Sequence, residues 1–173
     1  MAQAPAPGYR WVVLAVGMTA QASISALQLG LPAIAPEIRE QYSLSLVGIG
    51  TVLAASTVGI ILTLLAWGAL ADRIGARAVI GLGLSGATAA LLAAALTDSA
   101  RSLVVCLVVA GAFGSSANAA SGRAVVEWFG SGQRGFALGL RHMSTPLGGG
   151  IAALLLPLAV HQGGIGAAIP PPR

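Results

Sequence analysis

The chain has 173 residues, of which 56% are hydrophobic and only 8% are charged, whereas soluble domains carry roughly a quarter charged residues. Its net charge of +4 comes from nine arginines, with no lysine, against five acidic residues. These arginines stand singly at the ends of apolar runs, a pattern that sets membrane topology and does not suit a polyanion. The composition therefore excludes a soluble domain, argues against nucleic acid as a partner and predicts a membrane protein.

Five apolar segments are each long enough to cross a bilayer as a helix, which takes about 20 residues. The short links between them hold nearly all the charge. The sequence predicts an all-α fold, a polytopic bundle of about five transmembrane helices over residues 11–160, with a short lead at 1–10 and a Gly/Pro-rich tail at 161–173. The predicted spans are Trp11–Ile34, Leu46–Leu70, Ala78–Leu96, Leu103–Gly122 and Phe136–Val160.

Arginine is distributed unevenly between the two sides of these spans. If the N-terminus is cytoplasmic, five arginines lie inside and two lie outside, and the positive-inside rule favours that orientation. The sequence thus predicts a multi-pass protein of the cell membrane, surrounded by lipid, with the lead at 1–10 in the cytoplasm. The inside set is Arg10, Arg73, Arg77, Arg123 and Arg134, and the outside set is Arg39 and Arg101.

Polar residues follow one face of the first span. Gln21, Ser25 and Gln28 are four and three positions apart, so they lie on the same side of a helix. Polar side chains are costly against lipid, and they face either neighbouring helices or a water-filled cavity. Both alternatives stay open for Gln21 and Gln28, which makes them candidates for a substrate pathway.

A charged turn bounded by glycines joins the second and third spans. It reads Gly68-Ala-Leu-Ala-Asp72-Arg73-Ile-Gly75-Ala-Arg77. We expect Gly68 to permit close packing and Gly75 to adopt a positive φ that reverses the chain. Asp72 is expected to accept hydrogen bonds from helix-end amides or an arginine, and Arg73 and Arg77 to reach anionic headgroups or a partner carboxylate. The simpler interpretation is an ordinary charged loop.

This turn resembles the signature loop between helices 2 and 3 of the major facilitator superfamily of secondary transporters, and the resemblance covers all five spans in order. It implies that helices 1, 4 and 5 contribute to a central substrate cavity. Transporters of this kind have two six-helix halves that rock around a midplane site, and this chain holds five helices of one half. We therefore expect it to be truncated and inactive alone, and to need missing C-terminal helices or a partner membrane protein.

Residues in the fourth and fifth spans support the family resemblance but limit what it implies about the transport mechanism. The stretch Pro146-Leu-Gly148-Gly149-Gly150 is similar to the glycine-rich middle of the family's helix 5. Thr145 stands where antiporters of the family carry glycine, and Leu107 stands where an arginine is frequent. The resemblance therefore implies neither antiport nor proton coupling.

The fourth span carries a second row of small and polar residues, at Gly111, Ser115, Asn118 and Gly122. For its glycine and serine positions plain helix packing is favoured, because small residues let membrane helices approach closely. For Asn118, packing and cavity lining stay open as equal alternatives. Asn118 is therefore a further candidate for the substrate pathway.

Two opposite charges follow the fourth span, one helical turn apart. Arg123 and Glu127 are either an exposed i,i+4 pair, worth a few tenths of a kcal/mol, or part of a latch at the cytoplasmic face. In the latch hypothesis, one of them meets Asp72 or Arg73 in one transport state and releases it in the other.

For Arg141 in the fifth span, the sequence leaves two clearly different positions open. Five residues after Phe136, Arg141 lies about 8 Å into the span at a rise of about 1.5 Å per residue. It either snorkels back to the interface or faces the bundle interior, where it would attract an anionic solute group or pair with a carboxylate.

The sequence predicts no enzyme, no cofactor and no metal site, since it lacks paired carboxylates, metal-ligand spacing and a phosphate-cradling loop. The predicted function is secondary transport of a small solute, with an anion suggested by Arg141, through alternating access. The alternative is a small non-transporting membrane subunit that packs against a partner's helices.

Overall fold

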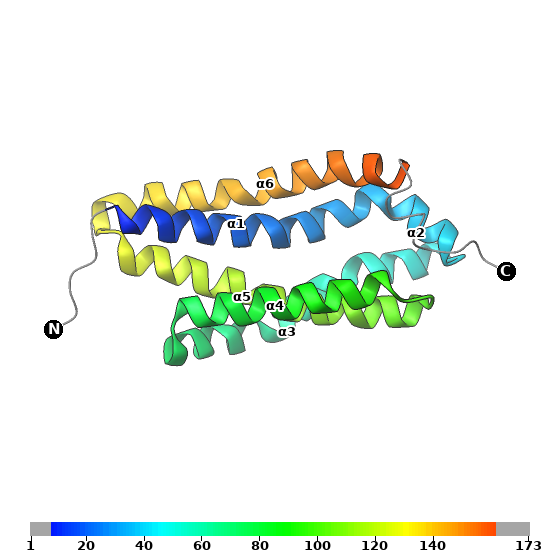
Figure 1. Cartoon of the computed structure of the whole chain (residues 1–173), viewed down its shortest axis with the longest axis horizontal. Helices are drawn as coiled ribbons and strands as arrows, with labels where there is room; N and C mark the ends of the chain where they lie inside the picture. Colours follow the sequence, from blue (N-terminus) through cyan, green and yellow to red (C-terminus); the bar gives the residue numbers. More distant parts are fainter. Residues whose placement is uncertain (1–7, 162–173) are drawn as a thin grey trace.

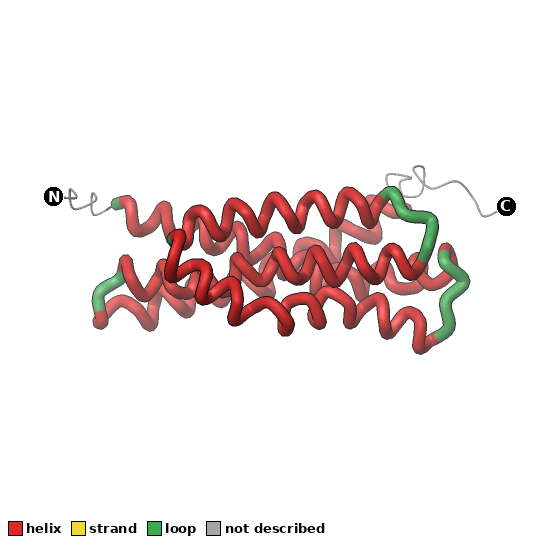
Figure 2. Tube along the Cα trace, turned by 90° about the horizontal axis from the view of Figure 1, so that it is seen from below, coloured by secondary structure: helices red, strands yellow, loops and turns green. Residues whose placement is uncertain are grey.

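The computed structural model describes residues 8–161, and within them it is built of long helices without a strand (Figures 1 and 2). This confirms the predicted all-α fold. The elements in chain order are α1 (Tyr9–Gly30), a 3-10 turn η1 (Leu31–Ile34), α2 (Ala35–Gln41), α3 (Leu46–Ile74), α4 (Ala76–Ala95), α5 (Ala100–Trp128) and α6 (Ser131–His161).

Within residues 8–161, five helical segments are long and apolar enough to cross a membrane, as the hydropathy pattern predicted. Helices α3, α5 and α6 extend past the predicted spans, because hydrogen bonding along the backbone continues where the apolar composition ends. The fourth reaches Trp128 instead of Gly122, and the last begins at Ser131 instead of Phe136. Most of the predicted lead at 1–10, and all but the first residue of the predicted tail at 161–173, lie outside the described residues.

The helices form two groups that share α5 as their link (Figure 1). In one group α1 and α6 lie side by side, and in the other α3 and α4 both pack on α5. The start of α1, the α3–α4 turn and the α5–α6 turn meet at one end of the bundle, at the left in Figure 1. We call this the charged end, and we call the opposite end, with α2 and the 96–99 turn, the distal end.

Glycines bring helix backbones into direct contact within each group. A Cβ atom added at Gly111 of α5 would lie 2.0 Å from the carbonyl oxygen of Ser56 of α3, and one added at Gly59 would lie 2.0 Å from that of Val108. Between α6 and α1, a Cβ at Gly148 would lie 2.2 Å from the carbonyl oxygen of Ala22. Close approach of this kind is how helices associate in lipid, where large apolar side chains gain little from meeting each other.

Large apolar side chains instead cover the outside of the bundle. Ile61, Leu62 and Leu65 of α3 are 70–87% exposed, and Leu154 of α6 is 72% exposed. Such a surface would be unfavourable in water but is compatible with lipid, which is as apolar as these side chains. The outer faces of α3 and α6 therefore fit the membrane assignment.

Candidate functional site

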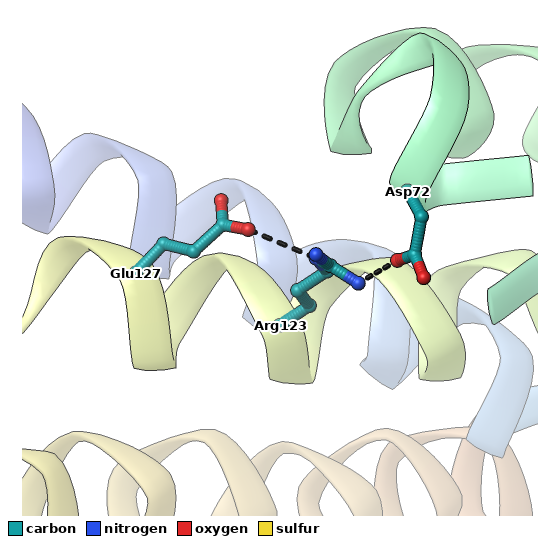
Figure 3. A network of polar contacts seen from close by, with 3 residues as sticks. All are labelled: Asp72, Arg123 and Glu127. Carbon is teal, nitrogen blue, oxygen red and sulfur yellow. Dashed lines mark hydrogen bonds and ion pairs between the residues drawn. The ribbon is translucent and has the colours of Figure 1, made fainter. Parts of the chain in front are cut away.

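An arginine at the charged end holds two carboxylates. Arg123 of α5 pairs with Asp72 of α3, and its Nε also donates to Glu127 Oε1 at 2.9 Å (Figure 3). Figure 3 shows the guanidinium lying between the two acidic side chains. All three side chains are about half exposed, so solvent screens them, and exposed pairs of this kind contribute about 0.2–1 kcal/mol each. The pairing crosses from α3 to α5 and joins the two helices at the charged end.

Small residues explain why α3 and α5 come close enough for this contact. Ala71 of α3 and Ala120 of α5 are buried in one cluster next to the pair, so the backbones approach and Asp72 reaches Arg123. Of the combinations that the sequence left open, the structure pairs Asp72 with Arg123. Arg73 is exposed and forms no ion pair with residues 8–161.

The turn between α3 and α4 is a single glycine. Gly75 has φ +85° and ψ 155°, a combination that is essentially restricted to glycine, and α4 begins at the next residue. The expected positive φ is confirmed. The expectation for Gly68 is wrong: a Cβ added there would meet nothing within 4 Å among the described residues. Trp67 packs against the core instead. Gly68, the next residue, lies about 100° further around the helix and so faces a different side.

This difference gives a paired prediction for stability. Gly75→Ala should destabilise the protein by about 1–3 kcal/mol, because alanine would be strained at that φ and ψ. Gly68→Ala should be neutral or stabilising by up to about 1 kcal/mol, because alanine is the better helix former and the space is open. Thermal unfolding in one detergent, followed by circular dichroism, measures both. Equal effects of the two substitutions would contradict the assignment.

A second polar cluster lies deeper in the bundle, around Arg141 of α6. The guanidinium is buried, with the residue only 6% exposed. Its Nε donates to Ser121 Oγ at 2.9 Å, and its Nη2 donates to the Asn118 carbonyl oxygen at 3.0 Å and to Gln21 Oε1 at 3.2 Å. Helices α1, α5 and α6 thus meet at one cation. Of the two alternatives for Arg141, the structure has the interior position and not the snorkelling one.

Neutral groups alone surround this cation within the described part of the chain. The two ion pairs found there both belong to Arg123, and the three acceptors of Arg141 are a hydroxyl, an amide and a backbone carbonyl. Gly122 lies beside the guanidinium, and a Cβ there would be in ordinary van der Waals contact with Arg141 Cζ at 3.7 Å. A buried charge is expensive unless it is paired, and Arg141 has no carboxylate partner among residues 8–161.

The other predicted pathway residues are arranged less directly. Gln21 is 7% exposed and contacts Arg141, but Gln28 is half-buried and has no side-chain hydrogen bond within residues 8–161. Asn118 contributes its backbone carbonyl and not its side chain. The sequence did not predict the contact of Ser121 with Arg141, because Ser121 lies one position before Gly122 and so falls outside the predicted row of small and polar residues.

Arg77 finds an aromatic partner that the sequence did not indicate. It donates a hydrogen bond to the hydroxyl of Tyr9, and its Cζ lies 5.5 Å from the centre of that ring. Tyr9 belongs to the predicted lead at 1–10. Because tyrosine is common at membrane interfaces, its position just before the first apolar span could have indicated a place at the interface.

Comparisons with known proteins agree with this architecture. The family model described as Major Facilitator Superfamily matches residues 11–169. Two curated relatives, each named an uncharacterised MFS-type transporter, are MT3072 and Rv2994 of two strains of Mycobacterium tuberculosis, CDC 1551 / Oshkosh and ATCC 25618 / H37Rv. Each is 32% identical to the chain over 156 residues, which are 90% of this chain and 35% of the relative. The chain therefore spans about a third of the length of the relatives it matches.

Proposed function

The chain belongs to the major facilitator superfamily, and on that premise we propose that it forms N-terminal helices of a secondary transporter that moves a small solute by alternating access. Both curated relatives are named as transporters, which favours this proposal over a non-transporting subunit. Because the matched residues are 35% of each relative, transport would need helices beyond these five, from a longer chain or from a partner protein.

The proposed orientation puts the charged end in the cytoplasm of the cell. The five arginines of the inside set belong to that end, and Arg39 and Arg101 belong to the distal end. An excess of arginine in short links is typical of the cytoplasmic side. The ion pair of Asp72 with Arg123 would then lie at the cytoplasmic membrane surface.

The proposed solute carries an anionic group, and the observation that supports this most is the burial of Arg141 among neutral acceptors. Ionisable residues inside a membrane bundle commonly mark a substrate pathway. Arg141 Nη1 makes no hydrogen bond to residues 8–161, so its two N–H groups are available to an oxyanion. Gln21 and the backbone of Asn118 would orient the guanidinium, and Gln28 would lie further along the same pathway.

The proposed role of Asp72, Arg123 and Glu127 is a latch that closes the charged end. The Asp72–Arg123 pair joins α3 to α5. Helix α5 also carries two of the groups that accept hydrogen bonds from Arg141. The pair's contribution of about 0.2–1 kcal/mol is small, so a transport cycle could break it. Opening this end would admit water toward Asn118 and Arg141.

Replacing Asp72 by asparagine tests alternating access. In a variant lacking Cys106, the chain's single cysteine, a reporter cysteine at Asn118 is labelled with a membrane-impermeant maleimide from either side. Asp72→Asn should raise the ratio of cytoplasmic to external labelling by about 1.4- to 5-fold, the factor that corresponds to losing one exposed pair.

Asp98→Asn serves as the matched control, because Asp98 is an exposed acid at the distal end that forms no ion pair with the described residues. It should leave the ratio unchanged. An unchanged ratio in Asp72→Asn as well would refute the latch, and the family assignment would stand without it.

A further inference from the structure

A pocket of about 550 Å³ opens at the charged end. It lies between the start of α1, the α3–α4 turn and the end of α5, and its wall is mainly apolar, with Val13, Ile74 and Ala124 among its residues. Every helix that forms it begins or ends there: Tyr9 is the first residue of α1, and Trp128 is the last of α5. Since these helices cross the membrane, the pocket lies at the level of the lipid headgroups.

The charges around the pocket leave a positive side. Asp72 and Glu127 are both held by Arg123. Arg77, which lines the pocket, is exposed and has no acidic partner among residues 8–161. Arg73, next to the pocket wall at Ile74, is likewise exposed without such a partner. Three arginines and two acids leave one net positive charge here, and two of the three guanidiniums contact no carboxylate of residues 8–161.

Aromatic rings complete the rim. Tyr9 and Trp128 both line the pocket, and their ring centres are 5.3 Å apart. Tyr9 also accepts the hydrogen bond from Arg77 that orients the guanidinium. Tyrosine and tryptophan with a polar tip and an apolar body are suited to headgroup depth. The pocket thus combines a cation at its rim, an aromatic pair and an apolar wall.

We propose that this pocket binds an anionic phospholipid of the surrounding membrane, with the headgroup phosphate on Arg77 and the upper acyl chain against Val13, Ile74 and Ala124. A phosphodiester is an acceptor for guanidinium donors, and anionic lipid attracts arginine near the membrane surface. Glu127 also lines the pocket and disfavours an anion, but its carboxylate is paired with Arg123. The site does not depend on the solute around Arg141.

Trp128 provides the readout, because it lines the pocket. The chain has three tryptophans, so Trp11→Phe and Trp67→Phe leave Trp128 as the single fluorophore. The protein is reconstituted in phosphatidylcholine vesicles that contain a minor fraction of phosphatidylglycerol with brominated acyl chains. Quenching of Trp128 should indicate about five-fold more phosphatidylglycerol beside it than the same fraction of brominated phosphatidylcholine gives, the factor expected for one arginine at the surface.

Substitutions at both ends of the bundle separate the possible outcomes. Arg77→Gln should abolish the preference, Arg77→Lys should keep most of it because the charge is retained, and Arg101→Gln at the distal end should leave it intact. A preference that survives Arg77→Gln, or one that Arg77→Lys also loses, would overturn the proposal. So would loss of quenching on adding inorganic phosphate at constant ionic strength, since the site would then bind a soluble anion and not a lipid.

Discussion

Gly111→Ala should destabilise the protein by about 3 kcal/mol or more, the upper end of the range for overpacked interiors. The added Cβ would lie 2.0 Å from the carbonyl oxygen of Ser56 and 2.7 Å from its carbonyl carbon. Those atoms are backbone of α3, so no side chain can turn away, and the two helices must separate. Separation would also weaken the hydrogen bonds that Thr63 and Trp67 of α3 donate to the Ala112 carbonyl, at 2.8 and 2.6 Å.

Gly150→Ala is the matched control, because a Cβ at Gly150 of α6 would meet nothing within 4 Å among the described residues. It makes the same chemical change inside a long helix and should be neutral or stabilising by up to about 1 kcal/mol. Thermal unfolding in detergent compares the two variants. The emission of tryptophan should also change in Gly111→Ala, since Trp67 would lose its acceptor. Equal unfolding midpoints would mean that α3 and α5 are not in backbone contact.

The sequence was sufficient for the number and order of the membrane-spanning segments within residues 8–161, though not for the short α2, because hydropathy reports directly which segments tolerate hydrocarbon. It was insufficient for their ends. Residues 123–128 carry charges and leave the apolar window, yet α5 continues through them to Trp128, since leaving the hydrocarbon does not break backbone hydrogen bonds. The same effect placed the start of the last helix at Phe136 in the prediction, whereas α6 begins at Ser131.

The candidate site was predictable as a set of residue types but not as a set of contacts. Asp72 and Arg123 were both candidates for a latch, but which charges meet depends on how α3 and α5 rotate against each other. That rotation follows from the contact of Gly59 and Gly111 with backbone, a long-range property. For Gly68 the sequence predicted a contact that the structure lacks among the described residues. Its place near Asp72 suggested close packing, but it lies on an open side of α3 within residues 8–161.

Arg141→Gln should weaken the proposed binding of an anionic solute group while changing the stability of the protein little. The three groups that accept hydrogen bonds from Arg141 are neutral, so removing the guanidinium leaves no uncompensated buried charge. The desolvation of a buried cation is itself unfavourable, and its removal offsets the lost hydrogen bonds. We expect the free energy of unfolding to change by about 1 kcal/mol or less.

The binding of anions should respond far more strongly. A hydrogen bond to a charged group contributes about 1.5–3 kcal/mol, so Arg141→Gln should weaken binding about 10- to 150-fold. The measurement is the rise in unfolding temperature of the detergent-solubilised protein with benzoate, acetate or inorganic phosphate, each compared with chloride at the same ionic strength. Arg101→Gln is the control for charge at a distance, and it should retain the full rise. If Arg141→Gln also retains it, or if none of the three anions stabilises the unmodified protein, then Arg141 has a structural role: it joins α6 to α1 and α5 through Gln21 and Ser121 and carries no solute.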